Sequence, residues 1–177
     1  MSKRVINILY LLLFINVCYV LSGVIYIPLQ SLDVVGRWLF KAKAIFVEGG
    51  MPFKTLNNPD FFLFHPHYPL LLPFLYSLFY FLIGRVWELP ILLLSPIYYV
   101  LILRLAYTAL KKIGLTSLQS LVYVYMYSML SPLLAQAGRM HAGMADIIIV
   151  LLGWLVVYLW QIAKSTVKTT LINQSAI

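Results

Sequence analysis

Residues 5–28 read VINILYLLLFINVCYVLSGVIYIP and follow the basic pair Lys3-Arg4. About 20 apolar residues in a helix cross the roughly 30 Å hydrocarbon core of a bilayer, so this stretch predicts a membrane-spanning helix. A basic start and an apolar body also fit a signal peptide. However, Val-Leu-Ser-Gly-Val at 20–24 is a poor small-residue cleavage site. We therefore interpret the stretch as an uncleaved first span.

The composition of the whole chain points the same way. Of its 177 residues, 63% are hydrophobic and 10% are charged, whereas a soluble domain carries about a quarter charged residues. The aromatic content of 15% excludes disorder, and the single Cys18 excludes a disulfide framework. The net charge of +8 comes without a basic run longer than two residues, so we expect no nucleic-acid partner. An integral membrane protein remains.

Further apolar segments predict an all-α integral membrane fold, a polytopic helix bundle with four to five membrane segments. Helices are expected because lipid-exposed strands would leave backbone groups unpaired. The chain is expected to form one membrane domain over 1–177. Its parts are a first span, a long outer loop bearing an interfacial helix, a membrane segment, three spans and a polar tail, at 5–28, 29–67, 68–83, 89–110, 118–137, 147–163 and 164–177.

Charge predicts which connections share a side of the membrane. Cytoplasmic flanks are enriched in Lys and Arg, and three basic clusters contain no acid: Lys3 and Arg4; Arg104, Lys111 and Lys112; Lys164 and Lys168. All five acids lie in the other connections, at positions 33, 48, 60, 88 and 146. We therefore predict a multi-pass protein of the plasma (cytoplasmic) membrane with 30–88 and 138–146 on the outer face.

This assignment requires an odd number of crossings between residues 30 and 111, where two apolar segments lie. The segment 68–83 is the shorter and holds Pro69 and Pro73. We interpret it as a re-entrant or membrane-embedded helix that returns to the outer side. The alternative is that it spans the membrane and that Lys111 and Lys112 lie outside.

Within the outer loop, residues 34–47 predict a helix that is capped by Asp33 and ends at Gly49-Gly50. Arg37 and Lys41 lie one turn apart on it, and a basic, aromatic helix of this kind lies in the headgroup plane. A plain interfacial anchor is the alternative. Further on, the prolines around His65, His67 and Tyr68 fix an extended entry into the next helix. Two histidines are too few ligands for a metal site.

A second outer turn carries Arg139, His141 and Asp146 just before an apolar helix. An acid at membrane depth is costly and is typical of a functional site, although a helix cap is the alternative role. The two outer regions together place Asp33, Asp146 and several cations on one face. Carboxylates beside cations suit general-base chemistry on a phosphate-linked substrate.

These residues resemble a known family. The pieces Leu32-Asp33, Trp38, Lys41-Ala42-Lys43-Ala44, Gly49-Gly50 and His65-Pro66-His67-Tyr68-Pro69-Leu70-Leu71 resemble the first outer loop of GT-C-class membrane glycosyltransferases, in the branch related to protein mannosyltransferases and aminoarabinose transferases. Gly143-Met144-Ala145-Asp146 is similar to the Gly-aromatic-Ala-Asp element that opens a later helix in that family, with Met144 in place of the aromatic residue. The match covers roughly residues 28–163.

The resemblance implies a polyprenyl-phosphate-linked sugar as donor, used at the outer face of the bilayer. Asp33 would activate the acceptor, Asp146 matches the second acid, and His65 stands where a lysine often contacts the lipid phosphate. Candidate substrate-binding residues are Arg37, Lys41, His65, His67, Tyr68 and Arg139. No cofactor is certain, and a divalent metal stays open.

Family members carry further helices beyond those matched here. The chain is therefore expected to be an N-terminal portion: a truncated product, a fragment, or one part of a split enzyme completed by a second chain. The alternative class is a small multi-pass scaffold or assembly protein in which Asp33 and Asp146 are helix caps. A transporter subunit ranks last, because Arg104 is the one charge inside a predicted span.

Overall fold

The fold is known from a computed structural model, which describes residues 2–27, 31, 33–64, 69–139 and 142–175. Residues 2, 62–64, 139 and 165–175 are described by their backbone alone. Every regular element in these ranges is helical. The elements are α1 (Ser2–Tyr26), η1 (Asp33–Leu39), α2 (Phe40–Glu48), α3 (Phe53–Leu56), η2 (Pro59–Phe64), α4 (Leu71–Ile83), α5 (Leu89–Leu92), α6 (Leu94–Lys112), α7 (Ser117–Ser128), α8 (Ser131–Leu134), η3 (Ala135–Arg139) and α9 (Ala145–Ser175).

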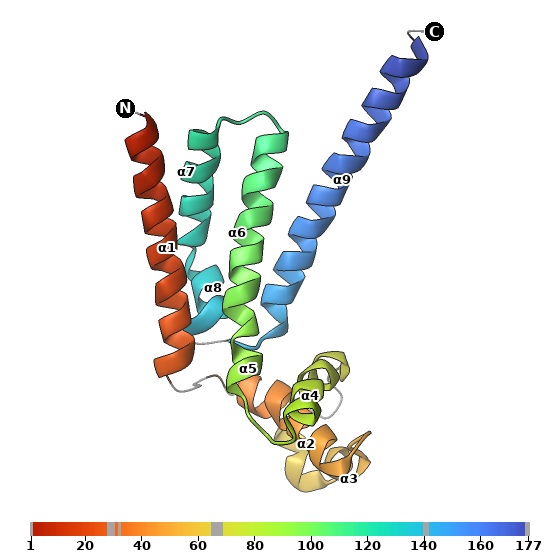
Figure 1. Ribbon diagram of the computed structural model, residues 1–177. Coiled ribbons are helices and arrows are strands. Elements are labelled where there is room, and N and C mark those ends of the chain that lie inside the picture. Colours follow the sequence, from red (N-terminus) through yellow and green to blue (C-terminus); the bar gives the residue numbers. More distant parts are fainter. Residues whose placement is uncertain (1, 28–30, 32, 65–68, 140–141, 176–177) are drawn as a thin grey trace.

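The helices α1, α6, α7 and α9 run side by side, and the short elements gather at one end of this bundle (Figure 1). We call this the loop end; it holds η1, α2–α5, η2 and the first turn of α9. The opposite end holds both chain termini and the α6–α7 connection (Figure 1), and we call it the basic end. All five acids lie in elements of the loop end or directly beside them, whereas Lys3, Arg4, Lys111 and Lys112 lie at the basic end. The acids are therefore confined to the loop end, whereas lysine and arginine residues occur at both ends.

Three helices of the described chain are long and apolar enough to cross a membrane: Lys3–Tyr26, Leu89–Lys112 and Ala145–Lys164. A fourth crossing results if α7 and the segment 131–138 form one span, although they are bent by 69°. The prediction of an all-helical protein with apolar helices of spanning length is thus confirmed. Insertion, and the number of four to five membrane segments, stay predictions. The helix of α9 continues to Ser175 through the predicted polar tail.

The predicted span 118–137 is broken because of Pro132. A proline lacks the N–H of the helical ladder and its ring crowds the carbonyl four residues earlier, which here belongs to Ser128. That carbonyl accepts a hydrogen bond from the Tyr99 hydroxyl of α6 at 3.0 Å instead. The Ser128 hydroxyl in turn accepts from the Asn16 amide of α1 at 2.9 Å. Polar side chains of two neighbouring helices therefore satisfy the break, as a low-dielectric environment requires.

The predicted membrane segment 68–83 contains α4, which packs against α2 at the loop end. With 13 residues the helix is about 20 Å long, which is shorter than the hydrocarbon core. One side buries Leu72, Tyr76 and Tyr80 in the protein, and the other exposes large apolar side chains: Leu71, Phe74, Leu75, Leu78, Phe81 and Leu82. A helix that is apolar on both sides is suited to lie partly in lipid. Its embedding as a re-entrant helix stays a prediction.

The core consists of two clusters. One lies at the loop end and joins η1, α2, α4 and α5 through Val34, Ala42, Tyr76, Tyr80 and Ile91. The other fills the bundle between α1, α6, α7 and α9. Between them, α1 and η3 come into direct contact at Gly138, where a Cβ would overlap the Val20 carbonyl oxygen and lie 2.9 Å from Val20 Cγ1. Only glycine allows this close approach.

We expect Gly138→Ala to lower the unfolding temperature, because the added methyl forces α1 and η3 apart. Overpacking of this kind costs about 1–3 kcal/mol. The matched control is Gly153→Ala in α9, where the new Cβ meets no atom within 4 Å; alanine should raise stability there by up to about 1 kcal/mol. Thermal unfolding in detergent measures both. Equal unfolding temperatures for the two variants would contradict the close approach.

The division into two ends predicts a labelling pattern. In a Cys18→Ser background, Asn57→Cys and Val86→Cys should react with an impermeant maleimide from one side of the membrane, and Ile113→Cys from the other. All three positions are exposed. Reaction of the residues at 86 and 113 from the same side would show that the bundle does not cross the bilayer as described.

Candidate functional site

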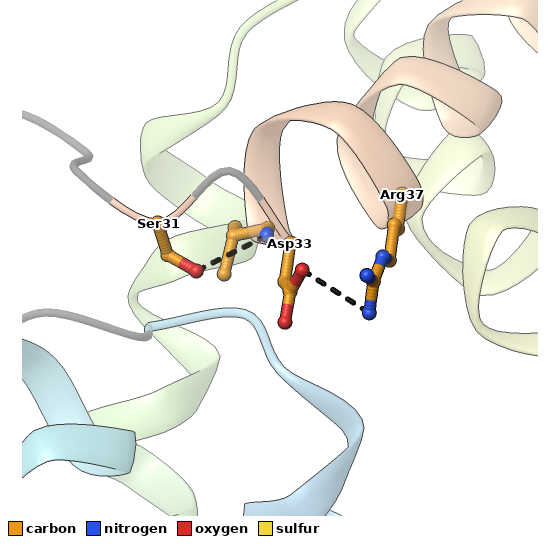
Figure 2. A network of polar contacts seen from close by, with 4 residues as sticks. Ser31, Asp33 and Arg37 are labelled. Atoms are coloured by element: carbon orange, nitrogen blue, oxygen red, sulfur yellow. Dashed lines mark hydrogen bonds and ion pairs between the residues drawn. The ribbon is translucent and has the colours of Figure 1, made fainter. Parts of the chain in front are cut away.

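The candidate site begins with the continuous helical segment η1–α2, which confirms the helix predicted over 34–47. Its first part is a π-helix, and the helix ends at Gly49, whose N–H donates to the carbonyls of Ile45 and Phe46. At the start, the hydroxyl of Ser31 accepts a hydrogen bond from the Val34 N–H at 3.4 Å (Figure 2). Ser31 therefore occupies the capping role that the sequence assigned to Asp33.

The carboxylate of Asp33 points along the helix toward Arg37 (Figure 2), and Asp33 Oδ1 lies 3.1 Å from Arg37 Nη1. The side chains are 40% and 28% exposed, respectively, so the pair is open to a ligand on one side. Its spacing of four residues is the one at which helical side chains meet. The prediction that Asp33 caps the helix is wrong, because the acid is held by an arginine one turn away.

One turn further along, the side chain of Lys41 is buried. Burial lowers the pKa of its ammonium below the ordinary value, and the nearby Arg37 guanidinium lowers that pKa further. Two cations thus lie close together on the helix that carries Asp33. Concentrated positive charge of this kind favours an anionic ligand.

The next lysine ties the segment to the rest of the loop end. The Lys43 ammonium forms an ion pair with the carboxylate of Glu88, at the start of α5. At the other end of α2, the Glu48 carboxylate accepts hydrogen bonds from the backbone N–H groups of Lys54 and Thr55 at 3.2 and 3.0 Å. Hydrogen bonding, led by the Thr55 hydroxyl, lowers the pKa of Glu48. These two acids are therefore engaged in structural contacts.

The second acid-bearing segment meets the first at the turn before α9. Val34, the neighbour of Asp33, lies within 3.4 Å of the position a Cβ would take on Gly143, three residues before Asp146. The backbone of this turn is held on both sides: Tyr76 of α4 donates to the Gly143 carbonyl at 2.8 Å, and the Gly143 N–H donates to Ser95 Oγ of α6 at 2.8 Å. The segments of the two predicted catalytic acids are thereby packed together.

Asp146 itself is exposed in the first turn of α9, where its Oδ2 accepts from the Gln136 amide at 3.0 Å. It does not cap the helix in the described part of the chain. Sequence reasoning missed Gln136, although a glutamine inside an apolar segment is a signal of a polar role. Sequence reasoning also missed Tyr76 and Ser95, and a tyrosine or serine in an apolar helix is too common to single out.

The other predicted substrate residues are placed only in part. His65, His67 and Tyr68 lie outside the described residues, as does His141, which was not in the predicted substrate-binding set. Arg139 is described by its backbone, at the end of η3 before the turn. The structure therefore joins Asp33, Arg37 and Lys41 on one helix and brings the segment of Asp146 against it. Among the described side chains, no three metal-ligating groups gather, and a divalent metal stays open as a cofactor.

Comparison with known proteins adds no relative: no family model, curated protein or solved structure matches the chain.

We expect Tyr76→Phe to loosen the junction between the two segments. The change removes the donor to a buried carbonyl, and an unsatisfied buried acceptor costs about 1–3 kcal/mol. Tyr26→Phe is the matched control, because the Tyr26 side chain is 80% exposed at the end of α1. Thermal unfolding in detergent should show a lower midpoint for the variant at 76 alone. The same midpoint in both variants would show that the hydrogen bond from Tyr76 to Gly143 does not stabilise the protein.

Proposed function

We propose that this chain is a membrane glycosyltransferase, or part of one. It transfers a sugar from a polyprenyl-phosphate donor to an acceptor at the outer face of the cytoplasmic membrane. The family resemblance of the two outer loops motivates the reaction class. The observation that carries the proposal is the packing of the Asp33 segment against the turn before Asp146, beside two cations.

Each residue then has a chemical task. Asp33 accepts the proton of the acceptor hydroxyl as that oxygen attacks the anomeric carbon of the sugar. The bond from this carbon to the phosphate oxygen breaks, and the polyprenyl phosphate leaves with the electron pair. The configuration at the anomeric carbon is inverted, because attack comes from the side opposite the leaving group. Transfer of a proton to a positioned carboxylate contributes typically 10²–10⁴-fold to such a rate.

The cations serve the leaving group. Arg37 is a bidentate donor with a fixed geometry that suits a phosphate. The buried Lys41, one turn away on the same segment, adds positive charge beside it. In the structure Arg37 is paired with Asp33, so a phosphate would compete with the carboxylate for the guanidinium. Binding of the donor would then release the base for the acceptor. His65, His67, Tyr68 and Arg139 complete the proposed substrate-binding set.

The lipid part of the donor would approach from the bilayer along α4, whose apolar side faces outward at the loop end. The loop end is the outer face in this proposal, because the basic end carries Lys3, Arg4, Lys111 and Lys112 without an acid, whereas all five acids accompany the cations of the loop end. A second chain that supplies further helices is a proposed partner, and it would complete the pocket for the lipid.

One observation favours the alternative of a scaffold or assembly protein. Only 6% of the Ala145–Lys164 window of α9 is buried in the protein, so a spanning helix is open to contact with another membrane protein. The premise that the two acids are helix caps does not support this alternative, because Asp33 pairs with Arg37 and Asp146 with Gln136.

A substitution that removes the charge of Asp33 distinguishes the glycosyltransferase from the scaffold. Asp33→Asn keeps the size of the side chain but removes the proton acceptor, so we expect sugar transfer to fall by roughly 10²–10⁴-fold. The assay supplies radiolabelled polyprenyl-phosphate mannose, glucose or aminoarabinose to membranes that contain the chain and its co-purifying partners. Label in the membrane lipids and proteins is then counted.

Asp60→Asn is the matched control. Asp60 is an exposed acid of the same outer region, and only its backbone N–H forms a described hydrogen bond. The Asp60→Asn variant should transfer sugar at the rate of the original chain. The circular dichroism of both variants should show the same helix content as the original chain. Full transfer by the Asn variant at 33 would exclude Asp33 as the base, and absence of transfer in all forms would favour the scaffold.

A further inference from the structure

Arg104 of α6 lies inside a helix of spanning length, far from the candidate site. Eight residues separate it from Lys112 at the end of the helix, a distance of about 12 Å along the axis, and its side chain is exposed. All five acids of the chain lie at the loop end, and the ion pairs among the described residues are Asp33–Arg37 and Lys43–Glu88. Arg104 therefore has no carboxylate partner within the described chain. A cation at this depth is costly unless an anion or water reaches it.

Two apolar grooves flank this arginine, and Arg104 lines both. The first lies between α6 and α9, has a volume of about 410 Å³, and is lined by Leu101, Leu151 and Leu155, with Thr108 and Tyr158 toward the basic end. The second lies between α1, α6 and α7 and has a volume of about 340 Å³; Leu13, Val17 and Val100 line it, with Tyr10 and Tyr107 toward the basic end. Each volume falls within the range of ligand sites.

The mouth of the first groove is positively charged. The Lys112 ammonium lies 4.2 Å from the centroid of the Tyr158 ring, which lines that groove. Nearby, the amide of Gln161 donates to the Ala109 carbonyl at 3.3 Å and fixes α9 against α6. Positive charge is thus found inside this groove, at Arg104, and at its mouth, at Lys112.

We propose that this face binds one anionic diacyl glycerophospholipid. The phosphate lies at Arg104, which lines both grooves, with Lys112 adding positive charge toward the basic end, and one acyl chain occupies each groove. The lipid fits in shape and in charge. The two apolar grooves share one cation, Arg104, and the two acyl chains of the lipid share one phosphate. Basic pockets between membrane helices on the cytoplasmic side favour anionic headgroups, and no acid at this end opposes the charge. This site lies at the opposite end of the bundle from the proposed catalytic site and is independent of it.

The test compares lipids bound to the purified full chain by native mass spectrometry. Dioleoyl phosphatidylglycerol should be retained over dioleoyl phosphatidylcholine, because the latter carries a compensating positive charge. Arg104→Gln should weaken phosphatidylglycerol binding by about fivefold, the ratio expected for one basic residue near an anionic headgroup. Arg85→Gln, the same change at an exposed position of the loop end, should leave it unchanged.

A second variant tests the groove without altering the charge. Leu155→Trp fills part of the α6–α9 channel and should also reduce retention, as should removal of one acyl chain in lyso-phosphatidylglycerol. Glycerol 3-phosphate, which lacks both chains, should not compete. Equal retention of the two phospholipids, equal binding by the variants at 104 and 85, or displacement of phosphatidylglycerol by an equimolar amount of undecaprenyl phosphate would overturn the proposal.

Discussion

The elements η1, α4, α5 and α6 meet at the backbone of Gly143. Its N–H and its carbonyl are both hydrogen-bonded to side chains. The N–H donates to Ser95 and the carbonyl accepts from Tyr76. Its φ of 90° is a conformation that residues with a side chain rarely adopt, and an added Cβ would also lie only 3.3 Å from Leu92 Cδ2. A buried peptide without these partners would be strongly unfavourable, so the junction of η1, α4, α5 and α6 with the start of α9 depends on it. The relative position of the Asp33 and Asp146 segments follows from this junction.

The helices of spanning length and the helix over 34–47 could be predicted because their signals are local. An apolar run of spanning length needs no tertiary information, and Gly49 marks a helix end on its own. Pro132 was equally visible, but the segment 118–137 was predicted as one unbroken span, and the break that this proline causes was not predicted. The position of α4 against α2 is different, because a 13-residue apolar helix is compatible with several placements and only packing selects one. The positions of the acids along the chain predicted that the connections 30–88 and 138–146 lie at the same end of the bundle.

The candidate site was predictable in its residues but not in their partners. Asp33 and Asp146 each precede or open a helix, and both were assigned capping as an alternative role. The structure gives the cap of the first helix to Ser31, because a serine two residues earlier reaches the Val34 N–H. Asp33 instead forms an ion pair with Arg37, and Asp146 accepts a hydrogen bond from Gln136. Such choices depend on side-chain geometry between elements, which residue spacing alone does not specify.

The contact between α1 and Gly138 has a mechanical consequence. The Val20 carbonyl faces the Gly138 Cα with no side chain between them, so α1 cannot slide or tilt without moving η3. The same short helix carries Gln136, the partner of Asp146. A thinner or thicker bilayer changes the tilt of a spanning helix. If α1 spans a bilayer, its tilt would therefore be transmitted through this backbone contact to η3 and to the partner of Asp146.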